Sequence, residues 1–125
     1  MERDQLTRKI IGCAIEVHRS LGPGLLESVY EECMAREMTQ AGISYKRQFP
    51  LPVIYKGSKL DCDYRVDFLV ADSIIVELKS VEALEGIHKA QTLTYMKLAG
   101  IKTGILINFN VEILKQGIRR LTLKI

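Results

Sequence analysis

The clearest pattern in the chain is a pair of short segments, residues 64–70 and 74–79, in which side chains alternate between two faces. β-branched and aromatic residues dominate both segments, which favours strands joined by a tight turn around Asp72 and Ser73. Because successive side chains of a strand point to opposite faces, each strand has one predicted apolar face. Those faces comprise Tyr64, Val66, Phe68 and Val70 in the first strand, and Ile74, Val76 and Leu78 in the second.

This arrangement puts Asp67 on the other face, with Ile75, Glu77 or Lys79 as its cross-strand partner. A three-residue loop would place Asp67 directly opposite Glu77, and like charges in that position destabilise a sheet. A hard divalent cation such as Mg²⁺, which takes carboxylate oxygens and water, would resolve the repulsion. Lys79 would then steady an attacking water or a developing negative charge. The pattern also permits a surface hairpin with a salt bridge from Lys79 to one carboxylate.

Helical periodicity is present on both sides of these strands. Apolar residues recur every three or four positions from Asp4 to Leu21, and residues 22–24, Gly-Pro-Gly, end this first helix. His18 lies beside the apolar stripe, where a histidine is usually a hydrogen-bonded residue at the edge of a core. A second helix is expected over residues 25–41 and a third over residues 83–98. The apolar faces are expected to comprise Leu26, Val29, Tyr30, Cys33, Met34 and Met38 in the second helix, and Ile87, Ala90 and Leu98 in the third.

The second and third helices also carry polar residues that are candidates for a functional site. Glu27 lies in the first turn of the second helix, and Tyr30 and Glu31 follow three and four residues later, so these side chains can share a face. Attraction to the helix macrodipole is the simpler explanation for an acidic residue there. Gln91 and Tyr95 are four residues apart on one stripe of the third helix. Taken alone, this spacing also fits a surface position for Gln91 and a core position for the Tyr95 ring.

The remaining strands are expected at residues 44–55, 60–70, 103–109 and 114–125. Pro50 and Pro52 make the first of these an edge strand, and residues 56–59 form a hairpin turn after it. Residues 103–109 are almost continuously apolar, as in a strand covered on both faces, and this strand follows a helix. It is therefore expected to cross over and pair in parallel with residues 74–79. The predicted order is α-α-β-β-β-α-β-β, an α/β sandwich with a mixed sheet.

Composition and charge limit the class of protein. A chain of 125 residues suits a single domain over residues 1–125 with a substantial core. Apolar residues make up 47% and charged residues 26%, the balance of an ordinary globular protein, and no signal peptide or membrane span is expected. Three widely spaced cysteines without a CxxC pair argue against zinc and disulfides and favour the cytoplasm. The net charge of +3 permits nucleic acid as a partner, and an exposed sheet edge permits a homodimer.

Taken together, the motifs resemble those of the PD-(D/E)XK nuclease superfamily. Asp67 followed by residues 77–79, Glu-Leu-Lys, resembles its signature, and residues 91–95 resemble the QxxxY motif of the RecB-like branch. Residues 24–30 resemble the GxxExxY motif that names a small family in this superfamily, and that resemblance extends along essentially the whole chain. One departure is that Val66 stands where the name-giving proline would precede the aspartate.

The resemblance implies a restriction-endonuclease-like αβββαβ core with an extra N-terminal helix. It implies metal-dependent hydrolysis of phosphodiester bonds in nucleic acid, DNA more than RNA, with Mg²⁺ or Mn²⁺. Asp67 and Glu77 would be metal ligands together with the backbone carbonyl of Leu78, and Glu27 would support the metal directly or through water. A catalytically idle module that binds nucleic acid or a protein partner is the alternative.

The resemblance also implies roles for the remaining polar residues. Lys79 would position or activate the nucleophilic water, and Gln91 and Tyr95 would bracket the site by contacting a phosphate or holding Lys79. Basic side chains would meet the phosphates of the nucleic-acid backbone. The candidates for these contacts are Arg65, Lys89, Arg119 and Arg120, with Lys46, Arg47 and Lys97 as further basic residues.

Overall fold

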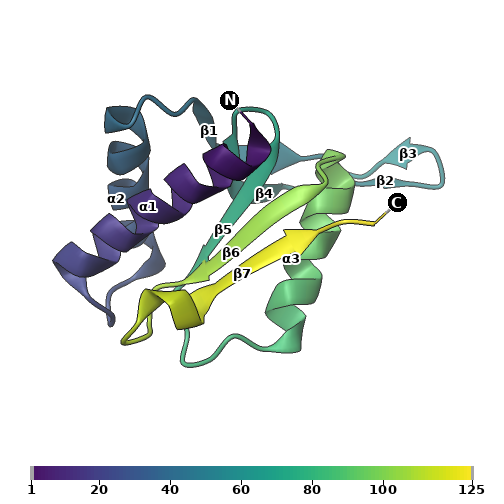
Figure 1. Ribbon diagram of the computed structural model, residues 1–125. Coiled ribbons are helices and arrows are strands. Elements are labelled where there is room, and N and C mark those ends of the chain that lie inside the picture. The colour runs from purple at the N-terminus through teal and green to yellow at the C-terminus, as the bar shows by residue number, and fades with distance from the viewer. Residues whose placement is uncertain (1, 125) are drawn as a thin grey trace.

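The computed structural model describes residues 2–124 and contains a five-stranded mixed sheet with helices on both faces (Figure 1). The strand order is β1-β4-β5-β6-β7, in which β5 and β6 are parallel and the other pairs antiparallel. This confirms the predicted α/β fold and the parallel crossover. The elements are α1 (Arg3–Leu21), α2 (Glu27–Gln40), β1 (Tyr45–Leu51), β2 (Ile54–Tyr55), β3 (Ser58–Lys59), β4 (Tyr64–Val70), β5 (Ile74–Lys79), α3 (Gly86–Ala99), β6 (Thr103–Asn108), the 3₁₀ turn η1 (Leu114–Gly117) and β7 (Ile118–Thr122).

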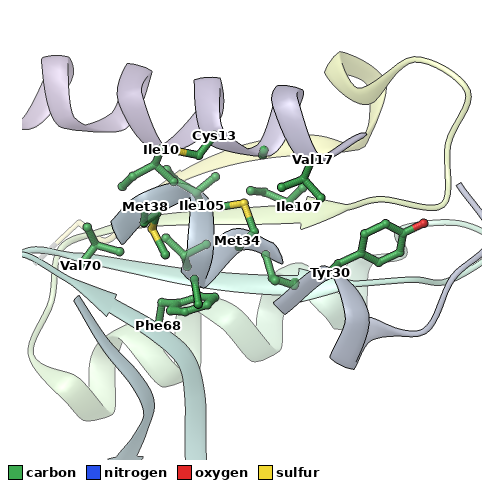
Figure 2. Packing of buried hydrophobic residues seen from close by; sticks show 14 of the residues in the cluster. Ile10, Cys13, Val17, Tyr30, Met34, Met38, Phe68, Val70, Ile105 and Ile107 are labelled. Atoms are coloured by element: carbon green, nitrogen blue, oxygen red, sulfur yellow. The ribbon is translucent and has the colours of Figure 1, made fainter. Parts of the chain in front are cut away.

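The larger part of the core lies between the sheet and helices α1 and α2 (Figure 2). The predicted stripe of α1 is buried there, although Leu21 at its end is 40% exposed. His18 also has its expected role at the core edge, because its ring nitrogen Nε2 lies 2.7 Å from the carbonyl oxygen of Val111. No helix within residues 2–124 is long and apolar enough to cross a membrane.

Tyr30 anchors the glycine-rich turn between the first two helices. Its ring is fully buried and stacks on Phe109, with the ring centroids 4.4 Å apart and the planes 6° from parallel. Its hydroxyl donates to the carbonyl oxygen of Gly22 at 2.6 Å and accepts from the backbone N–H of Leu25 at 3.1 Å. The side chain therefore points into the core and does not share a surface with Glu27, contrary to the expected common face.

Two residues of the predicted apolar face of α2 are also outside the core. Leu26 is 72% exposed because it precedes the helix, which begins at Glu27, and Val29 in the first turn is 38% exposed. The buried face of α2 begins one turn later, with Tyr30 and Met34. The first turn of α2 is therefore held by the anchoring of Tyr30 and leaves its side chains accessible.

The expected long strand over residues 44–55 is wrong, because β1 ends at Leu51 before Pro52. Pro52 has no backbone N–H to donate to the neighbouring strand. The chain then forms a separate hairpin of two short strands, β2 and β3, with its turn at Lys56 and Gly57. Figure 1 shows this hairpin projecting beyond the sheet. β1 is an edge strand, as the prolines predicted.

Two other strands are shorter than expected. β4 begins at Tyr64, since the preceding residues belong to the hairpin and its exit, and residues 114–117 form the 3₁₀ turn η1 before β7. The last residue of the predicted final strand, Ile125, lies outside the described residues.

The alternation predicted for β4 also fails at one point. Phe68 lies in the core on the α1–α2 side of the sheet, whereas Val66 is buried in the cluster on the α3 side. Tyr64 also lies against α3, where it lines a pocket together with Tyr95. The alternation of β4 side chains between the two faces breaks at Asp67. The backbone N–H of Asp67 donates to the side chain of Glu77 and not to a backbone carbonyl.

The face of α3 that meets the sheet also differs from the prediction. Thr92 and Met96 are the buried residues of this helix, and Met96 packs in the smaller core beneath the sheet. The predicted apolar stripe instead lies at the side of the helix, where Ile87 is 68% exposed and Leu98 lines the pocket beside Tyr64. Hence an apolar stripe of α3 has no partner within the described part of the chain.

Candidate active site

Asp67 and Glu77 lie opposite each other on β4 and β5, as a three-residue turn predicts. The strands pair from Val70 with Ile74 to Phe68 with Val76, so Asp67 is next in register with Glu77. Beyond that point each carboxylate binds the backbone of the other strand. Glu77 Oε1 accepts from the N–H of Asp67 at 2.7 Å, and Asp67 Oδ2 accepts from the N–H of Leu78 at 2.8 Å. These bonds fix both carboxylates side by side at the point where the regular ladder stops.

Within residues 2–124, neither carboxylate forms an ion pair with a basic side chain. Glu77 is only 5% exposed. Burial raises the pKa of Glu77 to about 8, with a further contribution from the charge of Asp67. Burial likewise raises the pKa of Asp67 to about 6, with the charges of Glu31 and Glu27 adding to the effect. A proton or a cation is therefore favoured here, and a surface hairpin with a Lys79 salt bridge is ruled out.

Glu31, which the sequence reading did not place in the site, extends the cluster from α2. Burial is the largest cause that raises the pKa of Asp67, and the charge of Glu31 adds to it. The side-chain amide of Gln48 donates to Glu31 and, at 3.3 Å, to Asp67 Oδ1. Arg47 Nε donates to Glu31 Oε2 at 2.7 Å, and Arg47 also reaches Glu32 at 3.2 Å. Arg47 and Gln48 thus hold Glu31 against the carboxylate pair.

The position of Glu31 could have been inferred from its spacing. It lies one turn after Glu27 on the same helix face, which is the spacing that suggested a common direction for the two side chains. Gln48 gives no such signal, because it occupies a left-handed backbone conformation with φ of 53° on an edge strand. That conformation is uncommon for a residue other than glycine.

Glu27 lies near the pair without contacting it through a described hydrogen bond. It is exposed at the start of α2, and its charge raises the pKa of both Asp67 and Glu77. The segment before it is tied to the far end of β5, because the hydroxyl of Ser80 donates to the carbonyl oxygen of Leu25. The start of α2 is therefore tied to the end of the strand that carries Glu77.

Lys79, Gln91 and Tyr95 complete the surroundings from β5 and α3. Lys79 is half-buried, and its charge lowers the pKa of Glu77. Burial raises the pKa of the Tyr95 hydroxyl, followed by the charge of Glu77, while a hydrogen bond with Gln91 lowers it. Gln91 and Tyr95 line a pocket of α3 together with Tyr64 of β4, and this pocket contains neither carboxylate.

The basic residues are distributed over several surfaces. Arg65 lies next to the site, since its Nη1 donates to the carbonyl oxygen of Gln48 at 3.3 Å. Lys89 and Arg119 line one shallow pocket at the start of α3. Arg120 points away from these residues and lies beside the first turns of α1. Arg65 thus lies against β1 at Gln48 and pairs with Asp63 at 3.2 Å, whereas Arg120 lies on another surface.

The donor set fits a divalent cation only in part. Two buried carboxylates, each bound to the backbone through one oxygen, suit a hard cation that prefers oxygen ligands. Within residues 2–124, however, no group of three His, Cys, Asp or Glu side chains is arranged to hold a metal ion. Asp67 and Glu77 would therefore need water or a backbone carbonyl to complete the coordination of a cation.

Comparison with protein families gives one match. Residues 4–121 match the family model described as the PD-(D/E)XK nuclease superfamily, which spans nearly the whole chain. The comparisons with curated proteins and with solved structures found no match.

Proposed function

We propose that this chain, which belongs to the PD-(D/E)XK nuclease superfamily, hydrolyses phosphodiester bonds of nucleic acid with Mg²⁺ or Mn²⁺, DNA being the more favoured substrate. The observation that carries the proposal is the pair of carboxylates of Asp67 and Glu77. They are held side by side by backbone N–H groups and lack a basic partner among residues 2–124.

Such a pair is costly in a structural role. Taking carboxylates out of water without a counter-charge costs several kcal/mol per ion in proteins, and replacing both by apolar residues would avoid that cost. A pair of this kind is expected where the charge has a use, which makes the site a candidate for cation-dependent chemistry. Asp67 and Glu77 would hold the cation, with the Leu78 backbone carbonyl, and with Glu27 directly or through water.

The other residues have roles that follow from their positions. When bound, the divalent cation would lower the pKa of a coordinated water and neutralise charge on the phosphate. Lys79 would orient that water or stabilise negative charge from the end of β5. Gln91 and Tyr95 would contact a phosphate or hold Lys79, and Arg65 would meet the backbone next to the cleaved bond.

The test is cleavage of labelled single- and double-stranded DNA and RNA with Mg²⁺ or Mn²⁺. Asp67→Asn and Lys79→Ala are each expected to lower the rate at least about a hundredfold, because each removes an interaction made in the transition state. Asp72→Asn is the matched control, since Asp72 carries the same group on the exposed β4–β5 turn and pairs with Lys46. Its rate should equal that of the wild type.

Two results would separate the proposal from its alternative. Absence of cleavage together with absence of Mg²⁺ and Mn²⁺ binding by calorimetry would overturn it. Retained binding of nucleic acid under those conditions would favour the catalytically idle binding module. Cleavage that survives Asp67→Asn would place the chemistry elsewhere in the chain.

A further inference from the structure

Strand β7 forms the edge of the sheet at the end opposite β1 (Figure 1). One side of β7 pairs with β6, and within residues 2–124 no strand pairs with its outer side. We propose that this outer edge binds an extended acidic segment of a protein partner, which adds to the sheet as a further strand. The edge is separate from the proposed site of hydrolysis, because β6 lies between β7 and β5, the strand that carries Glu77.

The register of β6 and β7 determines which backbone groups point outward. The N–H of Leu123 donates to the carbonyl oxygen of Lys102 at 2.8 Å, so these two residues are a hydrogen-bonded pair directly after the ladder. Hydrogen-bonded and non-hydrogen-bonded pairs alternate along antiparallel strands. The N–H and C=O groups of Arg120 and Thr122 therefore point away from β6, toward the outer edge.

Only the second half of this edge is open. At the first residue of β7, the Ile118 carbonyl oxygen accepts from Nη1 of Arg119 at 3.0 Å, and the Ile118 N–H donates to the carbonyl oxygen of Lys115. No other segment of residues 2–124 covers the edge beyond this point. A partner strand would therefore pair with residues 120–122.

The open edge is basic on the face of the sheet that carries α1. Arg120 is opposite Ile105, whose side chain belongs to the core beneath α1 and α2, so Arg120 lies on that face. It lines a pocket of about 260 Å³ together with Arg3, Asp4 and Thr122. Within residues 2–124 neither arginine forms an ion pair. Two unpaired cations beside one acid favour a further carboxylate from a ligand.

The face that carries α3 is basic at the same part of the edge. Arg119 is opposite Leu106 of the core beneath α3, and it lines a second pocket together with Lys89 and Glu85. Arg119 and Lys89 likewise form no ion pair in the part of the chain that the structure describes. Residues 113–124 contain no acidic side chain. The edge strand therefore has excess positive charge on both faces.

An extended acidic peptide matches both the backbone groups and the charges. In strand addition, main-chain hydrogen bonds provide affinity and alternate side chains provide specificity. Successive side chains of a strand point to opposite faces. Two consecutive acidic residues would therefore reach both faces, one meeting Arg120 and Arg3 and the other meeting Arg119 and Lys89.

A peptide strand fits this edge better than two other occupants. Phosphate oxygens of a nucleic acid accept hydrogen bonds, so they would leave the outward carbonyl groups of Arg120 and Thr122 without a donor. A second copy of the chain would bring Arg119 and Arg120 against the same two residues, and charged side chains on an edge strand oppose such self-pairing. The arginines therefore keep the edge free until an acidic partner binds.

Binding can be measured by fluorescence anisotropy of a short labelled peptide of valine and threonine with two consecutive glutamates at its centre. The same peptide with two glutamines should bind about tenfold more weakly, because two ion pairs are lost. Methylation of the central backbone nitrogens keeps the charge and removes the donors of the added strand, so it should abolish binding.

Two variants of the protein test the edge itself. Arg120→Glu should weaken binding of the glutamate peptide about tenfold and strengthen binding of a peptide with two lysines in its place. Thr122→Pro removes an outward N–H, a position where an edge strand tolerates proline. It should also weaken binding about tenfold, because the added strand loses a hydrogen bond and meets the proline ring. Lys59→Glu, the same charge reversal on the exposed β3, is the matched control for Arg120→Glu and should bind as the wild type does.

Several results would overturn the inference. These are equal affinity for the glutamate and glutamine peptides, full binding of the methylated peptide, or unchanged binding in Thr122→Pro. Binding of oligothymidylate that Arg120→Glu weakens, without binding of the peptide, would assign the edge to nucleic acid. A dimer in sedimentation that Thr122→Pro dissociates would assign it to a second copy. Thermal melts show that each variant is folded, and metal-dependent cleavage by Thr122→Pro should equal that of the wild type.

Discussion

The carboxylate of Glu77 accepts the backbone N–H of Asp67, while the carboxylate of Asp67 accepts the backbone N–H of Leu78 one residue further along β5. This exchange lets two acidic side chains stay adjacent inside the sheet, because each satisfies a backbone donor that the ladder leaves free. It orients one oxygen of each carboxylate toward the backbone, while the second oxygen of Asp67 accepts from the amide of Gln48 at 3.3 Å.

The first prediction concerns stability against pH without divalent cations. A carboxyl whose pKa is raised on folding binds its proton more tightly in the folded state, so unfolding becomes easier as pH rises. For Glu77 the window runs from its ordinary value of 4.5 to about 8. Thermal melts in EDTA should show stability falling across this window, by up to about 1.4 kcal/mol per pH unit for one group.

Glu77→Gln supplies the comparison for this pH series, because it keeps the size of the side chain and removes the titrating group. The melting temperature of Glu77→Gln should depend much less on pH between 5 and 8, the range that ends at the folded pKa of Glu77, about 8. Asp72→Asn, an exposed substitution, should follow the wild type. Parallel curves for wild type and Glu77→Gln would show that Glu77 does not carry the effect.

The second prediction concerns Mg²⁺ and Mn²⁺. Because the cation competes with protons for the same oxygens, it should raise the melting temperature more at pH 8 than at pH 5.5. At a concentration about a hundred times the dissociation constant, the gain should be about 2.7 kcal/mol. Calorimetry should detect proton release on binding, and Asp67→Asn should abolish the thermal shift. An equal shift in Asp67→Asn would place the cation away from this pair.

The sequence sufficed for those parts of the site that depend on local geometry. A three-residue turn and the two-residue period of a strand place Asp67 opposite Glu77 without further information. The parallel pairing of β6 with β5 follows from its apolar run and the preceding helix. Both features are confirmed, since β5 and β6 pair in parallel and the register of β4 with β5 brings Asp67 next to Glu77.

Features set by tertiary contacts could not be read in the same way. Val66 lies on the α3 side although its parity matches Phe68, and the break falls at Asp67, where the paired strand β1 has Gln48 with positive φ. The open stripe of α3 has the composition of a core face, and only the packing of Met96 against the sheet shows which face is buried. The bridging position of Gln48 depends on a backbone conformation that its residue type does not predict.

The third prediction tests that bridge with Gln48→Gly. Glycine adopts positive φ without strain, so the fold should be as stable as the wild type or up to about 1 kcal/mol more stable. The amide that joins Glu31 to Asp67 is lost, and cleavage is expected to fall about tenfold through misplacement of the carboxylate. Thermal melts and single-turnover rates measure the two effects separately.

Ala71→Gly is the matched control for this substitution, because Ala71 also has positive φ, 50°, but lies in the exposed β4–β5 turn. It should gain similar stability with no change in cleavage. If Gln48→Gly cleaves at the wild-type rate, Gln48 has only a structural role and the bridge does not position Asp67.

The last prediction concerns Asn108, which pairs with Lys79 across β6 and β5 and is 1% exposed. Its Oδ1 accepts the N–H of Val81 and its Nδ2 donates to the carbonyl oxygen of Val81, both at 3.0 Å, so it fixes the chain just after Lys79. Asn108→Ala should lower stability by about 2–3 kcal/mol, because the N–H of Val81 loses the Asn108 oxygen and its carbonyl keeps only the bond from Asn110. Cleavage should fall as well, since the end of β5 that carries Lys79 is no longer held.

Asn110→Ala removes a single bond to the same carbonyl, at 3.2 Å, and should cost about 0.5–1.5 kcal/mol. Denaturant unfolding of the two variants gives the stability difference, and Mg²⁺-dependent cleavage at a temperature where both are folded gives the effect on the site. Asn108→Ala should be the slower enzyme of the two even at equal folded fraction, because only Asn108 holds both backbone groups of Val81. Equal cleavage rates would mean that Lys79 is positioned by β5 alone, through its pairing with β6.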